Sequence, residues 1–249
     1  MDSHCHLQDP AFDADRDEVM ARAAAAGVER LLVPGYDLPS SRRALELARQ
    51  HPAVIRAAVG IHPHFAAKAS AEEWTELAGL AASPEAAAVG EIGLDYFRNL
   101  SPPEVQRQAF DRQLAVAAQL AKPVLVHDRD AHDDIRAGLL GWTGRGVLHA
   151  FSGDADLALE MTAAGFLVSF ALPLTFRSAT GPRAAAAAIP AGSFLVETDS
   201  PWLAPGGAEA RNEPTTAVRV AVELARLRDV APEEIATQVS AAFDRLLGG

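Results

Sequence analysis

The amino-acid sequence predicts an α/β fold, specifically a TIM (β/α)8 barrel of parallel strands and helices. One observation is the length of 249 residues, which suits a single barrel of this type. Another is that short apolar runs alternate with Ala-, Leu- and Arg-rich stretches of helical spacing along the chain. A third is that histidines and carboxylates recur where the apolar runs end, as expected for a barrel with one functional face.

Eight short apolar runs are the expected strands, and they cover residues 2–6, 30–34, 54–60, 87–91, 124–127, 146–149, 166–170 and 194–198. Between them, helical spacing predicts helices near residues 14–26, 39–50, 70–82, 103–120, 131–140, 154–164 and 180–188. The tail, residues 214–247, is expected to form two helices separated at residues 230–232. We expect Ser40, Ser70 and Asp154 to be helix N-caps, because short polar side chains accept hydrogen bonds from first-turn amides.

The competing architecture is an open, doubly wound sheet, since both folds consist of parallel strands with right-handed crossovers. An open sheet of that type usually carries a Gly-rich turn after its first strand, and this sequence has none there. No Ser/Gly-rich linker or block of like charge interrupts the alternation. We therefore expect residues 1–249 to form a single domain.

The composition is that of a globular protein, with 49% apolar and 22% charged residues. No run of about 18 uncharged apolar residues is present, and the N-terminus lacks the basic and apolar regions of a signal peptide, so we expect a cytoplasmic protein without a membrane partner. Cys5 is the only cysteine, which excludes an internal disulfide and a CxxC metal site. Because the net charge is −11, any attraction to a nucleic-acid backbone has to be local.

Six of the eight histidines lie at an expected strand end or within four residues after it: His4, His6, His62, His64, His127 and His149. Glu91 closes the fourth expected strand, and Asp199 follows the eighth. In a barrel, all of these strand ends open onto one face. His4 and His6 are two residues apart, so their imidazoles point to the same side of an extended strand. Four histidines and two carboxylates are sufficient to hold two divalent cations, and Glu91 is placed to bridge them.

Seven short motifs lie in order along the chain, at residues 2–7 (DSHCHL), 60–64 (GIHPH), 90–96 (GEIGLDY), 123–131 (PVLVHDRDA), 149–153 (HAFSG), 197–201 (ETDSP) and 211–214 (RNEP). Together they resemble the TatD family of metal-dependent hydrolases. This family belongs to the amidohydrolase-like TIM barrels, and its characterised members are deoxyribonucleases, several of them 3′-exonucleases. The resemblance therefore implies a metal-dependent phosphodiester hydrolase whose partner is a nucleic-acid substrate, DNA ends or short single strands.

The resemblance also implies roles for individual residues. The ligands of one metal ion match His4, His6, Glu91 and Asp199, and those of a second match Glu91, His127 and His149. Positions that face the substrate phosphate match His62, His64 and Arg129, and Arg211 lies in a stretch that matches a loop beside the active site, which makes it a further substrate-binding candidate. The two ions are expected to be Zn²⁺, Mn²⁺ or Mg²⁺, because mixed imidazole and carboxylate ligands tolerate all three.

The mechanism expected from this site is attack by an activated water on phosphorus. Asp199 orients the water and takes its proton, while Glu91 bridges the ions, and these two are the expected catalytic residues. Trp202 directly follows Ser200 and Pro201 at the expected barrel mouth and is a candidate to stack a nucleobase. Glu197 shares a strand face with Asp199 and is a candidate to support a metal ligand.

Two other functions stay open at this point. One is metal-dependent amide or ester hydrolysis, which shares the barrel but in many enzymes uses a carbamylated lysine as the bridging ligand. Neither lysine fits that role, because Lys122 precedes the fifth expected strand and Lys68 lies in a loop or helix start. The other is a non-catalytic, metal-bound adaptor, against which the complete ligand set argues. A phosphodiesterase is therefore favoured, and a monomer is the default expectation.

Overall fold

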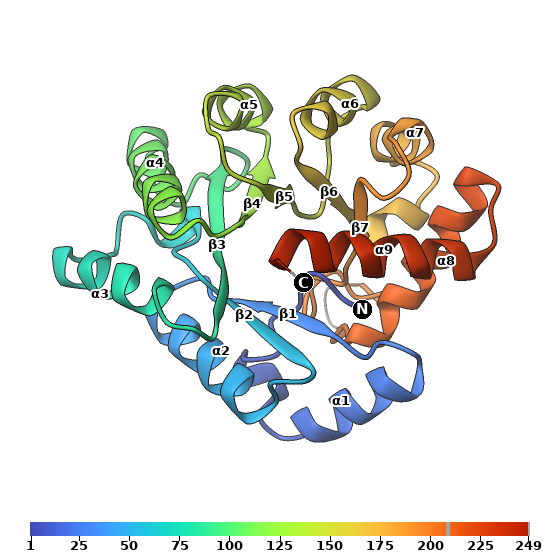
Figure 1. The fold of residues 1–249 in the computed structure, drawn as a ribbon, viewed down its shortest axis with the longest axis horizontal. Coiled ribbons are helices and arrows are strands. Elements are labelled where there is room, and N and C mark those ends of the chain that lie inside the picture. Colours follow the sequence, from blue (N-terminus) through green and yellow to red (C-terminus); the bar gives the residue numbers. More distant parts are fainter. Residues whose placement is uncertain (208–209, 249) are drawn as a thin grey trace. The chain divides into compact units, whose positions relative to one another are not determined.

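The structure is a computed structural model, and it describes residues 1–207 and 210–248 (Figure 1). The chain divides into two compact units. Unit 1 contains Met1–Val33 and His149–Gly249, and unit 2 is the continuous segment Pro34–Leu148. Strands and helices alternate in both units, which confirms the α/β alternation expected from the sequence.

Unit 2 contains four parallel strands, which pair in chain order. They are β2 (Ile55–Val59), β3 (Ala86–Asp95), β4 (Val124–Arg129) and β5 (Gly146–Leu148). The helices of this unit are α2 (Leu38–Gln50), α3 (Ala71–Ala81), α4 (Pro103–Leu120) and α5 (His132–Leu140), together with the short 3-10 helix η2 (Pro63–Phe65). Helix α2 packs on β2 and α4 packs on β3, and Figure 1 shows these helices beside their strands.

Unit 1 combines the two ends of the chain. Most of β1 (Leu31–Pro34) lies in this unit, and β6 (Leu167–Phe170) pairs in parallel with β7 (Phe194–Val196). Its helices are α1 (Arg16–Ala25), α6 (Ala155–Ala163), α7 (Thr180–Ala188), α8 (Ala217–Arg228) and α9 (Pro232–Leu247), with 3-10 turns η1 (Pro10–Phe12), η3 (Leu172–Thr175) and η4 (Pro214–Thr216). Helices α8 and α9 pack on one another, and α9 also packs on β7.

The first expected strand, residues 2–6, is a correction. In the part of the chain that the structure describes, this segment forms only an isolated bridge between Asp2 and Leu31. The reason is local, because the Asp2 carboxylate accepts hydrogen bonds from the His4 amide at 3.1 Å and from the Thr198 amide at 3.0 Å. A side chain thereby takes amides that a regular strand would give to a neighbouring backbone carbonyl.

The expected helices are all present, and capping residues and prolines explain where several of them begin. Ser70 and Asp154 are N-caps of α3 and α6, as predicted. The prediction for Ser40 was wrong, because Asp37 caps α2 and Ser40 sits three residues later, where its hydroxyl accepts the Asp37 amide in a capping box. Pro232 occupies the first turn of α9, where its missing amide hydrogen costs no hydrogen bond.

The strand interiors are apolar on both faces. Every residue of β1, β5 and β7 is buried, as is typical of parallel strands that are covered on both sides. Among the described residues, no helix is both long and apolar enough to cross a membrane. This interior core holds the strand ends in place, and the candidate functional residues lie on those ends.

Candidate metal and active site

Histidines and carboxylates gather in two clusters, one in each unit. We define the unit 1 cluster as His4, His6, His149, Glu197 and Asp199, and the unit 2 cluster as His62, His64, Glu91, Asp95 and His127. Most of these residues follow or close a strand, as expected from the sequence.

In the unit 1 cluster, two imidazoles converge on one carboxylate. Nε2 of His4 lies 3.1 Å from Nε2 of His6, which is the same-side arrangement predicted for their spacing. Oδ1 of Asp199 lies 3.4 Å from Nε2 of His6 and 3.8 Å from Nε2 of His4. The ring of His4 also stacks on that of His149, with centroids 3.9 Å apart.

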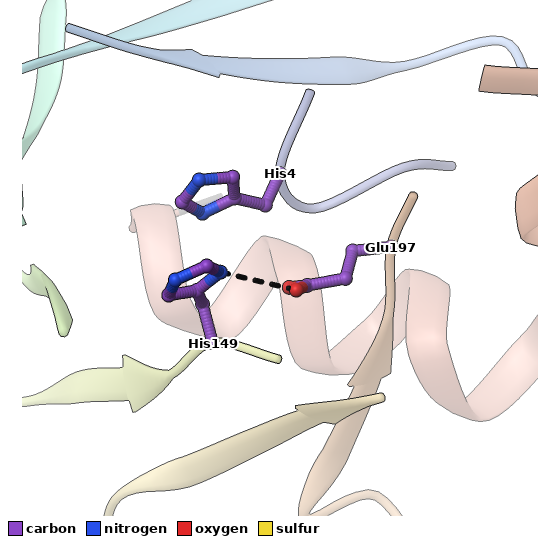
Figure 2. A group of neighbouring side chains, drawn as sticks. All are labelled: His4, His149 and Glu197. Carbon is purple, nitrogen blue, oxygen red and sulfur yellow. Dashed lines mark hydrogen bonds and ion pairs between the residues drawn. The ribbon is translucent and has the colours of Figure 1, made fainter. Parts of the chain in front are cut away.

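Glu197 contacts the imidazole of His149 at the Nδ1 atom and leaves the Nε2 atom of that ring facing away from it. Its Oε1 atom lies 3.2 Å from Nδ1 of His149 and accepts the Ala150 amide at 2.7 Å. Figure 2 shows the rings of His4 and His149 one above the other, with Glu197 reaching His149 from the end of β7. Because the Glu197 side chain is fully buried, this contact fixes the orientation of the His149 ring.

The backbone around Asp199 is held in an unusual conformation. Asp199 has φ of 55°, in the left-handed region, and its amide donates to the His4 carbonyl at 2.8 Å. The preceding Thr198 donates its hydroxyl to Asp2 at 2.6 Å. Burial raises the pKa of Asp2 to about 8, while its hydrogen bonds with Thr198 and His4 act against this shift and anchor the loop.

In the unit 2 cluster, two carboxylates hold three imidazoles. Oε1 of Glu91 lies 3.0 Å from Nδ1 of His127 and 3.3 Å from Nε2 of His62. Oδ2 of Asp95 lies 2.7 Å from Nε2 of His64 and 3.1 Å from Nε2 of His127. His62 also caps η2, because its Nδ1 accepts the His64 amide at 3.1 Å.

The shape of β3 brings Glu91 and Asp95 to this cluster. The register between β3 and β4 shifts between Val89 and Ile92, which is the behaviour of a β-bulge, and it redirects the side chains that follow. Gly93 then pairs with His127 with φ of 136°. A side chain at this position would meet the His127 carbonyl, since an added Cβ atom would lie 2.0 Å from it, so only glycine fits here.

Three groups in the two clusters have shifted pKa values: Asp199, Asp95 and His62. Burial acts against the charged form of Asp199, but the His6 hydrogen bond and the charges of His149 and His4 outweigh it and lower the pKa of Asp199. Burial likewise acts against ionised Asp95, and the hydrogen bonds from His127 and His64 again leave its pKa lowered. Burial lowers the pKa of His62 to about 4 in spite of the nearby Glu91 charge. Near neutral pH Asp199 and Asp95 are therefore ionised and His62 is neutral.

Both clusters fit a divalent cation by the chemistry of their donors. One ligand atom each from His62, Glu91 and His127 lies within 4.8 Å of the others, and the same holds for His4, His149 and Glu197. Metal–nitrogen and metal–oxygen bonds are about 2.0–2.2 Å long, so an ion can be reached by all atoms of such a group with small side-chain adjustments. Imidazole and carboxylate ligands together suit Zn²⁺, Mn²⁺ and Mg²⁺.

Asp95 is the site residue for which the sequence predicted no role. Its signal was present, because Glu91 and Asp95 are four residues apart and would share a face of a continuous strand. The expected strand ended at residue 91, which left Asp95 outside it. Glu197 was a candidate supporting group, and its contact with His149 agrees with that role.

The arginines predicted to contact substrate have protein partners. The Arg129 guanidinium lies over the ring of Phe97, 4.7 Å from its centroid. Arg211 donates to both carboxylate oxygens of Asp15, at 2.6 and 2.7 Å, and to Glu213 at 3.0 Å. A substrate phosphate would have to displace part of this ion-pair network, and the contact of Arg211 with substrate stays a prediction.

Comparison with known proteins decides the family. The family described as TatD related DNase matches residues 1–248. The chain belongs to this family. It is 36% identical to the uncharacterized metal-dependent hydrolase YabD of Bacillus subtilis, over 98% of this chain and 97% of the relative. It is also 38% identical to the 3′-5′ ssDNA/RNA exonuclease TatD of Erwinia tasmaniensis, over 97% of this chain and 96% of that protein. The chain is therefore a metal-dependent hydrolase of the TatD family.

Solved structures agree with this assignment. YjjV, a TatD homologue from Escherichia coli, is 32% identical and superposes with a TM-score of 0.91, covering 100% of this chain and 97% of the other. An uncharacterized amidohydrolase from Saccharomyces cerevisiae has a TM-score of 0.86 at 21% identity, covering 98% of both chains, and shows a likeness of fold. These neighbours confirm the predicted fold class, an α/β barrel of parallel strands and helices.

Proposed function

We propose that this TatD-family hydrolase is a metal-dependent phosphodiesterase that removes nucleotides from the 3′ end of single-stranded nucleic acid. Its main substrate is DNA. The observation that carries the proposal is the presence of a histidine–carboxylate cluster in each unit, both composed of metal-binding side chains. Relatives named as 3′-5′ ssDNA/RNA exonucleases, at 36–38% identity over 97–98% of this chain, support the choice of substrate. The single domain, the monomeric state and the cytoplasmic location expected from the sequence stay predictions.

We propose a dinuclear centre with two divalent ions, Zn²⁺, Mn²⁺ or Mg²⁺. The ligands of one ion are His4, His6, Glu91 and Asp199, and those of the other are Glu91, His127 and His149. The support within unit 1 is the convergence of His4 and His6 on Asp199. The support within unit 2 is the Glu91–His127 contact at 3.0 Å, in which each side chain offers one ligand atom.

Each protein group has a defined task in the proposed reaction. Divalent cations in such a centre supply Lewis acidity, which makes a coordinated water acidic near neutral pH. Asp199 orients the attacking water and accepts its proton, and its lowered pKa keeps it ionised and ready to do so. His62, His64 and Arg129 donate hydrogen bonds to the non-bridging phosphate oxygens as negative charge develops there. Attack on phosphorus then breaks the bond to the 3′ oxygen of the shortened strand, and this oxygen leaves as a hydroxyl by taking up the proton that Asp199 accepted.

The test uses chelator-treated protein that is reloaded with Zn²⁺, Mn²⁺ or Mg²⁺ in turn. The substrates are a 5′-labelled single-stranded DNA, the same sequence as RNA, and an N-acyl amino acid. We expect metal-stimulated shortening of the DNA from its 3′ end. His127→Gln should reduce the rate by a factor of at least about 100, whereas His51→Gln, at the end of α2 and outside both clusters, should leave it unchanged.

Three results would contradict the proposal. Metal-stimulated hydrolysis of the N-acyl substrate alone would assign the protein to amide chemistry. A lack of metal-stimulated hydrolysis of all substrates would favour a metal-bound adaptor. An equal loss of activity in the His127 and His51 variants would show that the reaction does not depend on the unit 2 cluster.

A further inference from the structure

We propose that the indole of Trp202 is a stacking platform for a nucleobase of the substrate. This inference rests on the proposed function and adds a base-binding subsite to it. The proposal is carried by three features of Trp202: its exposure, its contact with a candidate metal ligand, and the hydrogen bonds that anchor the backbone next to it.

Trp202 is exposed and yet lies directly against the unit 1 cluster. Its side chain retains 46% of its accessible surface. Its ring meets the ring of His6 edge to face, with centroids 4.6 Å apart and an interplanar angle of 68°. An aromatic surface at this distance from a candidate metal ligand is within reach of a base that flanks the scissile phosphate.

The loop that carries Trp202 is fixed by hydrogen bonds. The Trp202 amide donates to the carbonyl of Asp199 at 2.9 Å, which ties the indole to the candidate general base. Asn212, 1% exposed, donates its backbone amide to Pro201 and its side-chain amide to Thr198, both at 2.9 Å. The indole is therefore held in place before a ligand arrives, which lowers the entropy lost on binding.

Other exposed apolar side chains of unit 1 have different surroundings. Leu159 lies on α6, and Val218 and Val222 lie on α8, where single exposed apolar residues are ordinary. Phe176 follows η3. In the described part of unit 1, Trp202 is the exposed aromatic residue for which a ring contact with a cluster histidine is observed.

The charge of the protein favours a base over a phosphate as the ligand of this surface. The net charge is −11, and Lys68 and Lys122 are the only lysines, so general attraction to a phosphate backbone is weak. Stacking on an aromatic ring needs no charge and accepts every base, because each base has a π face. A single-stranded substrate exposes its bases for such a contact, whereas a duplex keeps them paired.

The test compares two substrates on the metal-loaded protein: a thymidine oligomer, and an oligomer of the same length and backbone whose sugars carry no bases. We expect Trp202→Ala to lower kcat/KM for the thymidine oligomer about 5- to 100-fold, and to change kcat/KM for the base-free oligomer less than about 2-fold. Trp202→Phe, which keeps an aromatic face, should recover most of the loss. An equal loss on both substrates would overturn the proposal and assign the ring to the support of His6, and no loss on either would overturn it as well.

Binding supplies a second readout that is independent of turnover. The chain has three tryptophans, so stacking of a thymidine oligomer on Trp202 should quench part of the intrinsic fluorescence of the metal-free protein. The quenching should disappear in Trp202→Phe and persist in Trp74→Phe, since Trp74 lies on α3 in unit 2 beside Arg112. Quenching that survives in Trp202→Phe would contradict the proposal. If the wild-type protein hydrolyses neither oligomer, the proposed function fails, which is distinguishable from a failure of the stacking contact.

Discussion

Oδ2 of Asp95 lies 3.1 Å from Nε2 of His127, while Nδ1 of the same ring lies 3.0 Å from Oε1 of Glu91. The imidazole of His127 is thus held between two carboxylates of β3, and each one engages a different ring nitrogen. Such a contact fixes the orientation and the tautomer of a histidine that binds a metal through its other nitrogen.

This geometry makes Asp95 a positioning residue. We expect Asp95→Asn to weaken the affinity for Zn²⁺ about 10- to 100-fold, because the amide holds the His127 ring less firmly. Titration of the chelator-treated protein with Zn²⁺ against a competing indicator measures this. Asp134→Asn, on α5 and bonded to Tyr96, is the matched control and should bind Zn²⁺ as the wild type does. Wild-type affinity in Asp95→Asn would refute the role.

Asp199 is expected to carry the proton transfer. Asp199→Asn should lower kcat on single-stranded DNA about 100- to 10,000-fold, because an amide accepts no proton from the attacking water. The side chains of aspartate and asparagine are nearly identical in size, so the thermal unfolding midpoint of the variant should stay close to that of the wild type. Steady-state kinetics and calorimetry on the same preparation test both statements. Near wild-type turnover would remove Asp199 from the reaction.

His62 predicts a pH dependence of stability. Its pKa falls from 6.5 in the unfolded chain to about 4 in the folded protein, so between these values the unfolded state binds the additional proton. The His62 contribution is therefore fully present above pH 6.5 and is lost as the pH falls toward 4. We expect urea unfolding of metal-free protein to show a loss of up to about 3 kcal/mol across this window from this residue. His62→Gln should flatten the slope, and an unchanged slope would contradict the assignment.

Gly93 is expected to be sensitive to substitution. Gly93→Ala places a Cβ atom against the His127 carbonyl at a positive φ, so we expect the free energy of unfolding to fall by at least about 2 kcal/mol. Gly79→Ala is the matched control in α3, where nothing lies within 4 Å of an added Cβ atom. It should raise stability by about 0.5–1 kcal/mol. Urea unfolding measures both free energies. Equal changes in the free energy of unfolding of the two variants would argue against the close approach of Gly93 to the His127 carbonyl.

The sequence was sufficient to predict most elements, and it predicted the proximity of several candidate site residues. Helical periodicity located all nine expected helices, because each buries part of its surface against the core, and several begin at a polar cap or a proline. The placing of histidines and carboxylates at expected strand ends predicted that His4, His6 and Asp199 lie close together, as their contacts show. The shared side of His4 and His6 follows from their two-residue spacing in an extended segment.

The errors have local causes that strand patterns do not express. The segment at residues 2–6 lost its regular ladder to the side chain of Asp2, which alternation alone does not reveal. The fourth expected strand continues beyond residue 91 to Asp95, because Gly93 is accommodated within β3 next to His127. A glycine in such a run usually marks a break or a bulge, so the pattern alone does not indicate that the strand reaches Asp95.

The division of the chain has a consequence for its synthesis on the ribosome. Unit 2 is one uninterrupted segment, so all of its residues leave the ribosome before the second part of unit 1 is translated. The unit 1 cluster can form only later in synthesis, because His4 and His6 emerge among the earliest residues and Asp199 emerges after β7. A product of premature termination before β7 would thus lack Asp199, the proposed proton acceptor, and we expect it to be hydrolytically silent.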